Sequence, residues 1–405
     1  MSQSLLLLPQ HPAPATPSTL SAAYSSSLSA VLSSLKTSSS STKLIIALAS
    51  SSFKDRLKEP RSQIYNEVEK LLGGLYSLIC SICAKEDVDI TSKLPGAVDC
   101  RIVLLDYDST RFSTDKNSGR DASLGVLAGG PIVGLPLFAS TRRQWSKIFS
   151  VQGEEGQNLL RDFLHFANGI SPPLRAEFQM VSGGVSMIQH ASQSVQPNSS
   201  ASHTVVAVGG TFDHLHAGHK LLLTATALLL QPAASVQDPS RRLIIGITGD
   251  ELLKNKKYAD HLQSWEERQN DVVEFLISIL SFTQTSQEEA IQTVPLTTSN
   301  GRATHTKLNA RSITIECAEI QDAFGPTITD ESVTALVVSG ETRSGGQAVN
   351  DKRVEKGWKA LEVYEVDVLD AQADLETTPK SDFATKISST AIRKQMADRA
   401  RTSSL

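Results

Sequence analysis

The chain has 405 residues, of which 40% are apolar and 20% charged, a composition typical of a soluble globular protein with room for two domains. Its formal net charge of -4 argues against a nucleic-acid partner, because contact with a phosphate backbone needs a clustered excess of Lys and Arg. No stretch approaches the roughly 20 apolar residues of a membrane span, so we expect no membrane partner. Four scattered cysteines do not make a disulfide framework, which favours a reducing compartment, and we expect a cytoplasmic protein.

Residues 1–41 are rich in Ser, Pro, Thr and Ala and include the run Ser38–Ser41. Such a composition has too little apolar surface to offset the entropy lost on ordering, so we predict a disordered tail over residues 1–41. The apolar run Leu5–Leu8 ends at Pro9 and has no Lys or Arg before it, so it does not fit a secretory signal.

Residues 42–189 alternate between strand-like and helical patterns and predict an α/β domain of unknown role. In chain order we predict a buried strand at 44–48, a helix at about 60–84, a strand at 102–105, and helices at 141–148 and 157–167. Cys80 and Cys83 form a C-x-x-C in an apolar run with no second Cys or His pair nearby, which favours two buried helix positions over a metal or redox site.

The polar stretch 190–203 is the candidate linker to a second domain, residues 204–405. There we predict strands at 205–208, 243–247, 312–316, 335–338 and 361–364, and helices at about 217–230, 265–280 and 390–396. Aliphatic strands separated by helices predict a parallel sheet covered on both faces, which is a doubly wound, Rossmann-like α/β fold. The polar segment 283–311 shows neither pattern and is expected to be a surface insertion.

The first strand of this second domain runs into a loop of unusual composition, Gly209-Gly210-Thr211-Phe212-Asp213-His214-Leu215-His216-Ala217-Gly218-His219-Lys220. Parallel sheets bind ligands at the carboxyl ends of their strands, where the next helix offers free N–H groups and a positive dipole to phosphate. The glycines let the backbone approach an anion, and the two histidines project to the same side of the helix start. Their imidazole N–H groups can donate to a polyphosphate during displacement at phosphorus. A histidine pair alone would favour satisfied side chains near a helix end; the strand, the Gly-Gly-Thr run and HxGH together favour phosphate binding.

This loop resembles GGTFDxxHxGH, the first motif of the HxGH nucleotidyltransferase superfamily, whose members stabilise an α-phosphate under attack without a covalent enzyme intermediate. Residues 386–393, KISSTAIR, are similar to the second phosphate-binding motif of that superfamily. In this resemblance Ser388, Ser389 and Thr390 cap a helix whose N-terminus faces the β- and γ-phosphates. Standing alone, the same residues would fit an ordinary Ser/Thr helix cap.

Residues 335–353 indicate the branch of the superfamily, because they read ALVVSGET, then Gly345-Gly346-Gln347-Ala348-Val349-Asn350 and Arg353. Over about residues 204–398 the chain resembles the eukaryotic, fungal-type phosphopantetheine adenylyltransferases. The resemblance implies adenylyl transfer from ATP to 4′-phosphopantetheine, giving dephospho-coenzyme A and pyrophosphate, a step of coenzyme A biosynthesis. It also implies that Mg²⁺ arrives with ATP and is held mainly by substrate oxygens and water, with no residues dedicated to it.

The resemblance assigns roles to particular residues. Those implied as catalytic are Thr211, His219 and Lys256, the last preferred over its neighbours Lys254 and Lys257. Those implied for ATP are Gly209, Gly210, Thr211, Phe212, His216, Gly218, His219, Ser339, Glu341, Ser388, Ser389, Thr390 and Arg393. Those implied for phosphopantetheine are Thr211, Lys254, Lys256 and Arg343. The pair Glu267-Arg268 fits either a helix-surface ion pair or a ligand contact.

Two alternative functions stay open. A cytidylyltransferase, or another nucleotidyltransferase acting on a small phosphate ester, shares HxGH, although Ala384-Thr385-Lys386 does not match the R-T-x-G typical of the cytidylyltransferases before Ile387. A non-catalytic scaffold could recruit other coenzyme A enzymes through residues 42–189, but it would have no need of both histidines and the distant ISST helix.

Overall fold

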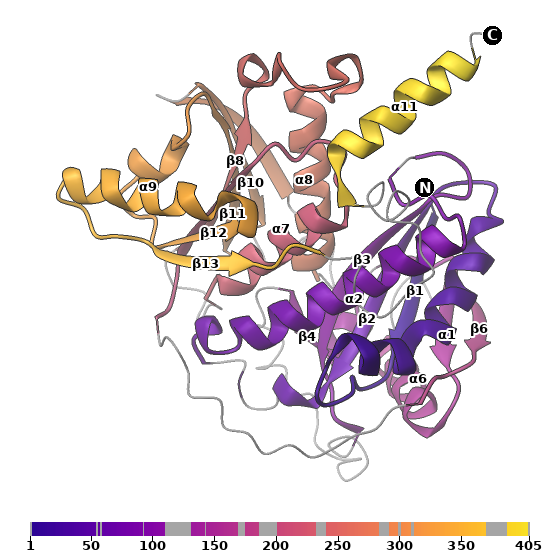
Figure 1. Ribbon diagram of the computed structural model, residues 1–405. Coiled ribbons are helices and arrows are strands. Elements are labelled where there is room, and N and C mark those ends of the chain that lie inside the picture. The colour runs from indigo at the N-terminus through magenta and orange to yellow at the C-terminus, as the bar shows by residue number, and fades with distance from the viewer. Residues whose placement is uncertain are drawn as a thin grey trace.

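The computed structural model contains two β-sheets, one built by each half of the chain (Figure 1). It describes residues 2–53, 56, 59–91, 93–109, 131–141, 143–168, 175–185, 201–231, 240–282, 291–298, 301–308, 312–369 and 387–403. Most of the candidate linker, up to residue 200, lies outside these residues, as does Lys386 of the second motif. No helix in these ranges is long and apolar enough to cross a membrane.

The first sheet has six parallel strands in the order β4-β3-β2-β1-β5-β6. Its half of the chain contains, in order, β1 (Ser2–Leu8), α1 (Pro17–Lys36), β2 (Thr42–Ser50), the 3-10 turns η1 (Ser51–Phe53) and η2 (Arg61–Gln63), α2 (Tyr65–Lys85), β3 (Val98–Asp106), β4 (Ile132–Gly134), α5 (Leu135–Ala139), β5 (Lys147–Val151), α6 (Glu154–Ala167) and β6 (Glu177–Val181). Because β1 is central and the chain winds away from it in both directions, this half is also doubly wound.

The prediction of a disordered tail over residues 1–41 is wrong. Ser2–Leu8 form β1, which pairs with β2 on one side and β5 on the other, and Leu5–Leu8 are fully buried. Thr16 caps α1 and Pro17 occupies its first turn. The buried residues of α1 recur every three or four positions (Leu20, Ala23, Tyr24, Leu28, Val31, Leu32, Leu35). The many serines between these positions lower the average hydrophobicity of the segment, so its composition does not show this periodicity.

The prediction of a helix at 141–148 is also wrong, because residues 147–151 form β5 beside β1. The β-branched and aromatic residues Ile148, Phe149 and Val151 suit a buried, pleated position between two strands. By contrast, α2 and α6 confirm the helices predicted at about 60–84 and 157–167. Cys80 and Cys83 are fully buried within α2, as the simpler interpretation held.

The second sheet has seven strands in the order β13-β12-β7-β8-β11-β10-β9. Its half contains β7 (Val205–Gly210), α7 (Ala217–Leu229), β8 (Arg241–Thr248), η3 (Asp250–Leu253), η4 (Ala259–His261), α8 (Trp265–Leu280), β9 (Ile291–Thr298), β10 (Gly301–Leu308), β11 (Ile313–Ile320), η6 (Gly325–Ile328), β12 (Ala335–Ser339), η7 (Gly340–Thr342), α9 (Arg343–Glu355), β13 (Glu362–Val366) and α11 (Ser389–Ser403). The five parallel strands, with β7 central, confirm the Rossmann-like prediction.

The segment predicted as a patternless insertion contains a β-hairpin. β9 and β10 pair antiparallel with each other, and β10 pairs with the free edge of β11. Residues such as Thr293 and Thr306 do not alternate clearly between polar and apolar, so the sequence offered little sign of strands here. Pairing with an edge that only the folded sheet creates makes them strands.

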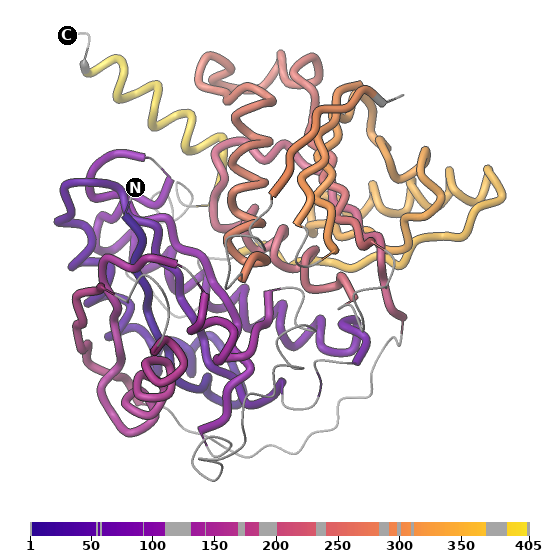
Figure 2. Tube along the Cα trace, turned by 180° about the vertical axis from the view of Figure 1, so that it is seen from behind, coloured from indigo at the N-terminus to yellow at the C-terminus, as the bar shows by residue number. Residues whose placement is uncertain are grey.

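With β4 and the β9–β10 hairpin left aside, the two sheets repeat one strand order: the first strand is central, the second and third lie to one side, and the last two lie to the other. Between the sheets, α2 packs against α7 (Figure 1). Every residue of α7 from Lys220 to Leu229 is buried, and one apolar core continues through both halves. Figure 2 shows from behind that α8 also lies against the first half, where it contacts β3.

Candidate functional site

The loop between β7 and α7 holds the two motif histidines in contact. His216 is the N-cap residue of α7 and His219 lies in its first turn. Their rings stack with 3.8 Å between centroids and 20° between planes. Gly218 permits this stacking, because a Cβ there would come within 3.3 Å of the His216 ring. Phe212 is fully buried with its ring 5.4 Å from that of His219, so it supports the pair from the core.

Both imidazoles are neutral. Burial, reinforced by His219 and Lys220, holds the pKa of His216 well below its ordinary value. Burial, with a smaller effect from His214, lowers the pKa of His219 to about 3. The Nδ1 atoms of His216 and His219 are buried and find no hydrogen-bond partner among the described residues. A neutral imidazole carries one N–H donor, so each ring can offer a hydrogen bond to an anion.

Asp213 connects this loop to the second motif. Its fully buried carboxylate forms an ion pair with Arg393 of α11, 180 residues further along the chain, and accepts a hydrogen bond from the Gln263 N–H at 3.0 Å. Its carbonyl accepts a hydrogen bond from the Ser389 hydroxyl at 2.8 Å. The two motifs, predicted separately from the sequence, therefore meet at one acidic residue.

The start of α11 lies over the first turn of α7. The Ile387 carbonyl oxygen is 3.9 Å from the place that a Cβ on Gly218 would occupy. Ser388 lies just before α11, and Ser389 and Thr390 open it, as predicted. The Arg393 guanidinium is 2% exposed and donates to the Lys257 carbonyl at 3.0 Å and to the Thr390 hydroxyl at 3.2 Å, besides its pair with Asp213. In this structure, therefore, Arg393 links parts of the site to one another.

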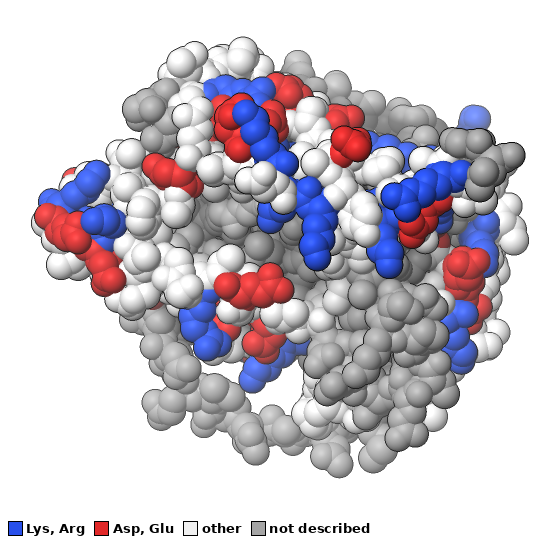
Figure 3. Space-filling model, turned by 45° about the horizontal axis from the view of Figure 1, so that its top comes forward, with Lys and Arg blue, Asp and Glu red and all other residues white. Residues whose placement is uncertain are grey.

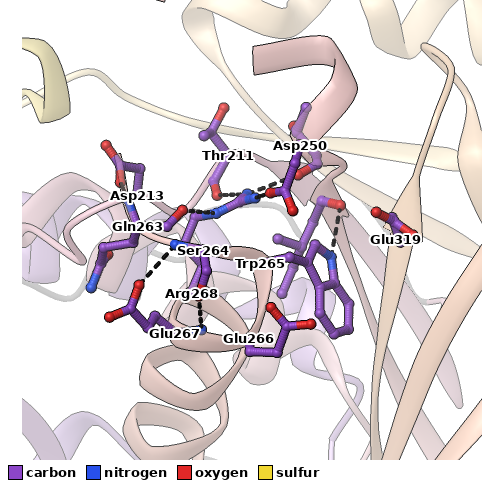
Figure 4. A network of polar contacts seen from close by, with 12 residues as sticks. Thr211, Asp213, Asp250, Gln263, Ser264, Trp265, Glu266, Glu267, Arg268 and Glu319 are labelled. Carbon is purple, nitrogen blue, oxygen red and sulfur yellow. Dashed lines mark hydrogen bonds and ion pairs between the residues drawn. The ribbon is translucent and has the colours of Figure 1, made fainter. Parts of the chain in front are cut away.

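Arg268, in the first turn of α8, clamps the carboxyl ends of β7 and β8 together (Figure 4). Its Nη1 donates to the carbonyls of Thr211 at 2.9 Å and Thr248 at 2.8 Å, and its Nη2 donates to Asp250 at 2.7 Å. The guanidinium is fully buried, and its hydrogen bond fixes the position of the Thr211 backbone from the interior of the protein.

Glu267 and Arg268 do not form the helix-surface ion pair that was one interpretation of this pair. Glu267 closes a capping box at the start of α8, where its carboxylate accepts from the Ser264 N–H at 2.8 Å. Arg268 points the other way and donates hydrogen bonds to backbone carbonyls and to the Asp250 carboxylate, as Figure 4 shows. The E-R pair is thus a glutamate that caps α8, followed by a buried arginine that joins the ends of β7 and β8.

Three exposed lysines, Lys254, Lys256 and Lys257, follow η3. Lys254 forms an ion pair with Glu251, and the Lys257 carbonyl accepts from Arg393, which places this segment beside α11. Figure 3 turns the top of the molecule forward and shows Lys and Arg side chains beside a hollow, with Asp and Glu side chains among them. Clustered positive charge of this kind attracts anions.

Ser339 and Glu341 stand at the carboxyl end of β12, the strand that pairs with β7. They therefore lie on the same edge of the sheet as the HxGH loop, on the other side of the point where the strand order reverses. Arg343 opens α9 and donates from Nε to Glu365 of β13 at 2.7 Å. Its side chain is 72% exposed, so the pair lies on the surface.

Two further residues of the branch motif are structural. Arg353 is 1% exposed and, among the residues that the structure describes, donates to the backbone carbonyls of Thr327, Asp330, Glu331, Val333 and Lys359. Asn350 donates to the Leu361 carbonyl at 3.0 Å and accepts from its N–H at 2.8 Å. Both tie α9 to the amino ends of β12 and β13, away from the histidines.

The described residues include no group of three His, Cys, Asp or Glu side chains that could hold a metal ion. What the site offers is hydrogen-bond donors, from imidazoles, hydroxyls and backbone, together with lysine charge. These groups suit an anion whose negative charge increases during a reaction.

Comparisons with known proteins agree with this geometry. A family model described as cytidylyltransferase-like matches residues 207–395, and another, described as a domain of unknown function, matches residues 1–187. The phosphopantetheine adenylyltransferase of Pyrococcus abyssi is 31% identical over 193 residues, which cover 48% of this chain and 90% of that protein. This chain belongs to the phosphopantetheine adenylyltransferase-like nucleotidyltransferases.

Two fungal relatives match this nucleotidyltransferase over stretches of similar length. An uncharacterized protein of Schizosaccharomyces pombe is 38% identical over 193 residues, 48% of each chain. The phosphopantetheine adenylyltransferase of Saccharomyces cerevisiae is 34% identical over 190 residues, 47% of this chain and 48% of that protein. The match thus spans about half the length of these two curated relatives.

Reasoning from the sequence missed two residues that hold the nucleotidyltransferase site together, Asp213 and Arg268. Asp213 carried a signal, because an acidic side chain beside a predicted phosphate site needs a cation to neutralise it. That cation, Arg393, had itself been assigned to ATP. Arg268 carried no comparable signal, since a surface and a buried arginine look alike in one sequence.

Proposed function

We propose that this nucleotidyltransferase transfers an adenylyl group from ATP to 4′-phosphopantetheine, forming dephospho-coenzyme A and pyrophosphate. The observation that carries the proposal is the meeting of the HxGH turn and the ISST helix at Asp213, next to two neutral imidazoles with unused Nδ1 atoms. The choice of acceptor rests on the names of the Pyrococcus abyssi and Saccharomyces cerevisiae relatives.

In the proposed reaction, a phosphate oxygen of phosphopantetheine attacks the α-phosphorus of ATP. An O–P bond forms to the acceptor, the bond from the α-phosphorus to the bridging oxygen breaks, and pyrophosphate leaves with the electron pair. The attacking oxygen is already ionised at neutral pH, so the protein needs no general base. Its task is to align two anions and to stabilise the charge that moves onto the leaving group.

The proposed donors come from both motifs. His219 and the Thr211 backbone and hydroxyl would contact the α-phosphate, with Arg268 holding Thr211 in place. His216, Ser388 and the free N–H groups at the start of α11 would contact the β- and γ-phosphates. Gly209 supports this arrangement, because a Cβ there would meet no atom within 4 Å, which leaves room for a ligand beside the backbone.

The lysine segment and the end of β12 would complete the two binding sites. Lys256 or Lys254 would approach the acceptor phosphate, whereas Ser339 and Glu341 would lie toward the nucleoside. Arg343 reaches phosphopantetheine only if it leaves its pair with Glu365. Mg²⁺ would enter with ATP, bound to its phosphate oxygens, as part of the substrate.

Pyrophosphate release by the purified full-length protein tests the proposal. We expect release only with Mg-ATP and 4′-phosphopantetheine together, and a loss of at least about 100-fold in His219→Ala, because donors to a developing charge contribute that much. His165→Ala, at an exposed position of α6, is the matched control and should behave as the unaltered protein.

Each other result excludes the proposal in a different way. Release that requires CTP in place of ATP would assign a cytidylyltransferase. Release from ATP with another phosphate ester, and none with phosphopantetheine, would change the acceptor. No release with any pair would favour a scaffold that has lost catalysis.

A further inference from the structure

The first half of the chain, which matches a domain of unknown function, contacts three helices that carry part of the site, α7, α8 and α11. Its strand β3 contacts α8 and binds the side chain of Lys220 of α7, its helix α2 packs against α7, and Asp89, just after α2, lies 3.7 Å from Arg399 of α11. It also holds the end of β13, where the Tyr65 hydroxyl donates to the Glu365 carbonyl at 3.1 Å. These contacts place the first half directly beneath the nucleotidyltransferase site.

Of the residues that connect the two halves, Lys220 lies closest to the two motif histidines. It follows His219 directly, and its backbone N–H donates to the His216 carbonyl at 3.0 Å, closing the turn that carries both rings. Its side chain is 6% exposed and crosses into the first half. There Nζ pairs with Asp99 Oδ1 and donates to the Cys100 carbonyl at 3.2 Å.

Asp99 uses both carboxylate oxygens. While Oδ1 holds Lys220, Oδ2 accepts from Arg101 Nη2 at 2.6 Å and from its Nε at 3.0 Å. Arg101 continues to Glu274 of α8, with 2.9 Å between Nη2 and Oε2, and Lys43 pairs with the same glutamate. Alternating charges thus run from the helix of the histidines to the helix of Arg268 through β3 of the first half, and Lys43 of β2 joins them at Glu274.

The charge state of Asp99 agrees with this arrangement. Burial alone would raise the pKa of the carboxyl, but Lys220 and Arg101 outweigh that effect and hold its pKa well below the ordinary value. Asp99 is therefore ionised throughout the physiological range. Asp99 binds Lys220 of α7 through one oxygen and, through the other, Arg101, which pairs with Glu274 of α8. The positions of both helices therefore depend on this one carboxylate.

We infer that Asp99 of the first half is a positioning residue for His216 and His219, acting through Lys220, so that the domain of unknown function forms the base of the nucleotidyltransferase site. This inference rests on the proposed function. A small displacement of the first turn of α7 would move both rings relative to the start of α11, and catalysis by alignment is sensitive to displacements of that size.

The test compares Asp99→Asn with the unaltered full-length protein in the pyrophosphate assay, normalised to the folded fraction. We expect kcat to fall at least about tenfold. The KM values for ATP and phosphopantetheine should stay within about twofold, because most binding contacts lie on other elements. Asp99→Glu keeps the charge and should recover part of kcat.

A matched control sits at the same interface but far from the histidines. Arg143 of the first half donates from Nη2 to the carbonyls of Ser278 at 2.6 Å and Ser281 at 2.9 Å, at the far end of α8. Arg143→Met should lower stability while leaving kcat unchanged. If it lowers kcat as much as Asp99→Asn does, the interface supports the fold in general and the positioning role is wrong.

Lys220→Met provides a second route should Asp99→Asn fail to fold, because Asp99 then keeps Arg101. It should lower kcat to a similar extent, and the double variant should be no worse than either single one, as expected for residues that act together. An unchanged kcat in Lys220→Met overturns the inference, as does an additive loss in the double variant. An inactive unaltered protein would instead contradict the proposed function itself.

Discussion

The carboxylate of Asp213 and the guanidinium of Arg393 form a buried ion pair that joins the β7–α7 loop to α11. Asp213→Asn keeps the size of the side chain and removes its charge, leaving Arg393 buried without a counter-ion. Removing one partner of a buried pair costs about 3–5 kcal/mol. We expect urea unfolding to show a loss of this order, and pyrophosphate release to fall at least about 100-fold as both motifs lose their shared anchor.

The control for that experiment is Lys352→Ala, which removes an exposed pair with Glu355. Surface pairs contribute about 0–1 kcal/mol, so this variant should unfold almost as the unaltered protein does. Equal stability of Asp213→Asn and Lys352→Ala would show that the buried pair does not join the motifs.

Gly218→Ala should separate activity from stability. The added methyl group would press on the His216 ring at 3.3 Å, so we expect pyrophosphate release to fall at least about tenfold. Helix propensity alone favours alanine over glycine by about 1 kcal/mol, so the midpoint of urea unfolding should change little or rise. Gly73→Ala, where the Cβ would lie an ordinary 3.7 Å from Leu221, should gain stability and keep its activity. A fully active Gly218→Ala would mean that the stacking is not needed.

Arg268→Lys tests the clamp at the strand ends. Lysine keeps the charge but cannot reach the carbonyls of Thr211 and Thr248 and the Asp250 carboxylate at once. Buried carbonyls left without donors cost about 1–3 kcal/mol each, so thermal or urea unfolding should show a loss of about 2–4 kcal/mol. Arg302→Lys, at a partly exposed arginine that pairs with the same Asp250, should cost less than about 1 kcal/mol. Similar losses in the two variants would rule out the clamp.

The buried histidines predict a specific pH dependence of stability. Because the pKa of His219 is lowered to about 3 when folded, the unfolded chain binds a proton between its ordinary pKa of 6.5 and about 3 that the folded chain does not. Stability is therefore fully present above pH 6.5 and falls as the pH is lowered through that window. Urea unfolding of His219→Gln, which cannot take up the proton, should show a shallower decline. His165→Gln, at an exposed histidine, should follow the unaltered protein; if His219→Gln does so too, His219 is not buried as a neutral ring.

The N-terminal strand makes a prediction opposite to that of a disordered tail. Leu6 is fully buried in the centre of β1, so Leu6→Ala should lower the free energy of unfolding by about 2–5 kcal/mol. Leu94→Ala, at a leucine that is 57% exposed, should change it by no more than about 0.5 kcal/mol. An effect of Leu6→Ala as small as that of Leu94→Ala would show that β1 is not part of the hydrophobic core.

Much of the second half was predictable because its signals are local. Buried parallel strands read as short aliphatic runs, and the HxGH and ISST residues fall at a strand end and a helix start whatever the rest of the chain does. The first 41 residues were not predictable from composition, since serine between regularly spaced leucines lowers the average without removing the apolar face of α1. The β9–β10 hairpin was not predictable either, because its strands exist by pairing with β11.

The sequence by itself determined which residue types stand at the carboxyl ends of the parallel strands, since those depend on spacing of a few residues and on the turn chemistry of one loop. Only the tertiary structure decided what holds them there. Asp213 with Arg393, Arg268 with Thr211, and Asp99 with Lys220 are each pairs far apart in the chain. The packing of strands and helices decides which charges and donors meet at such separations. No periodicity in the sequence indicates these pairings.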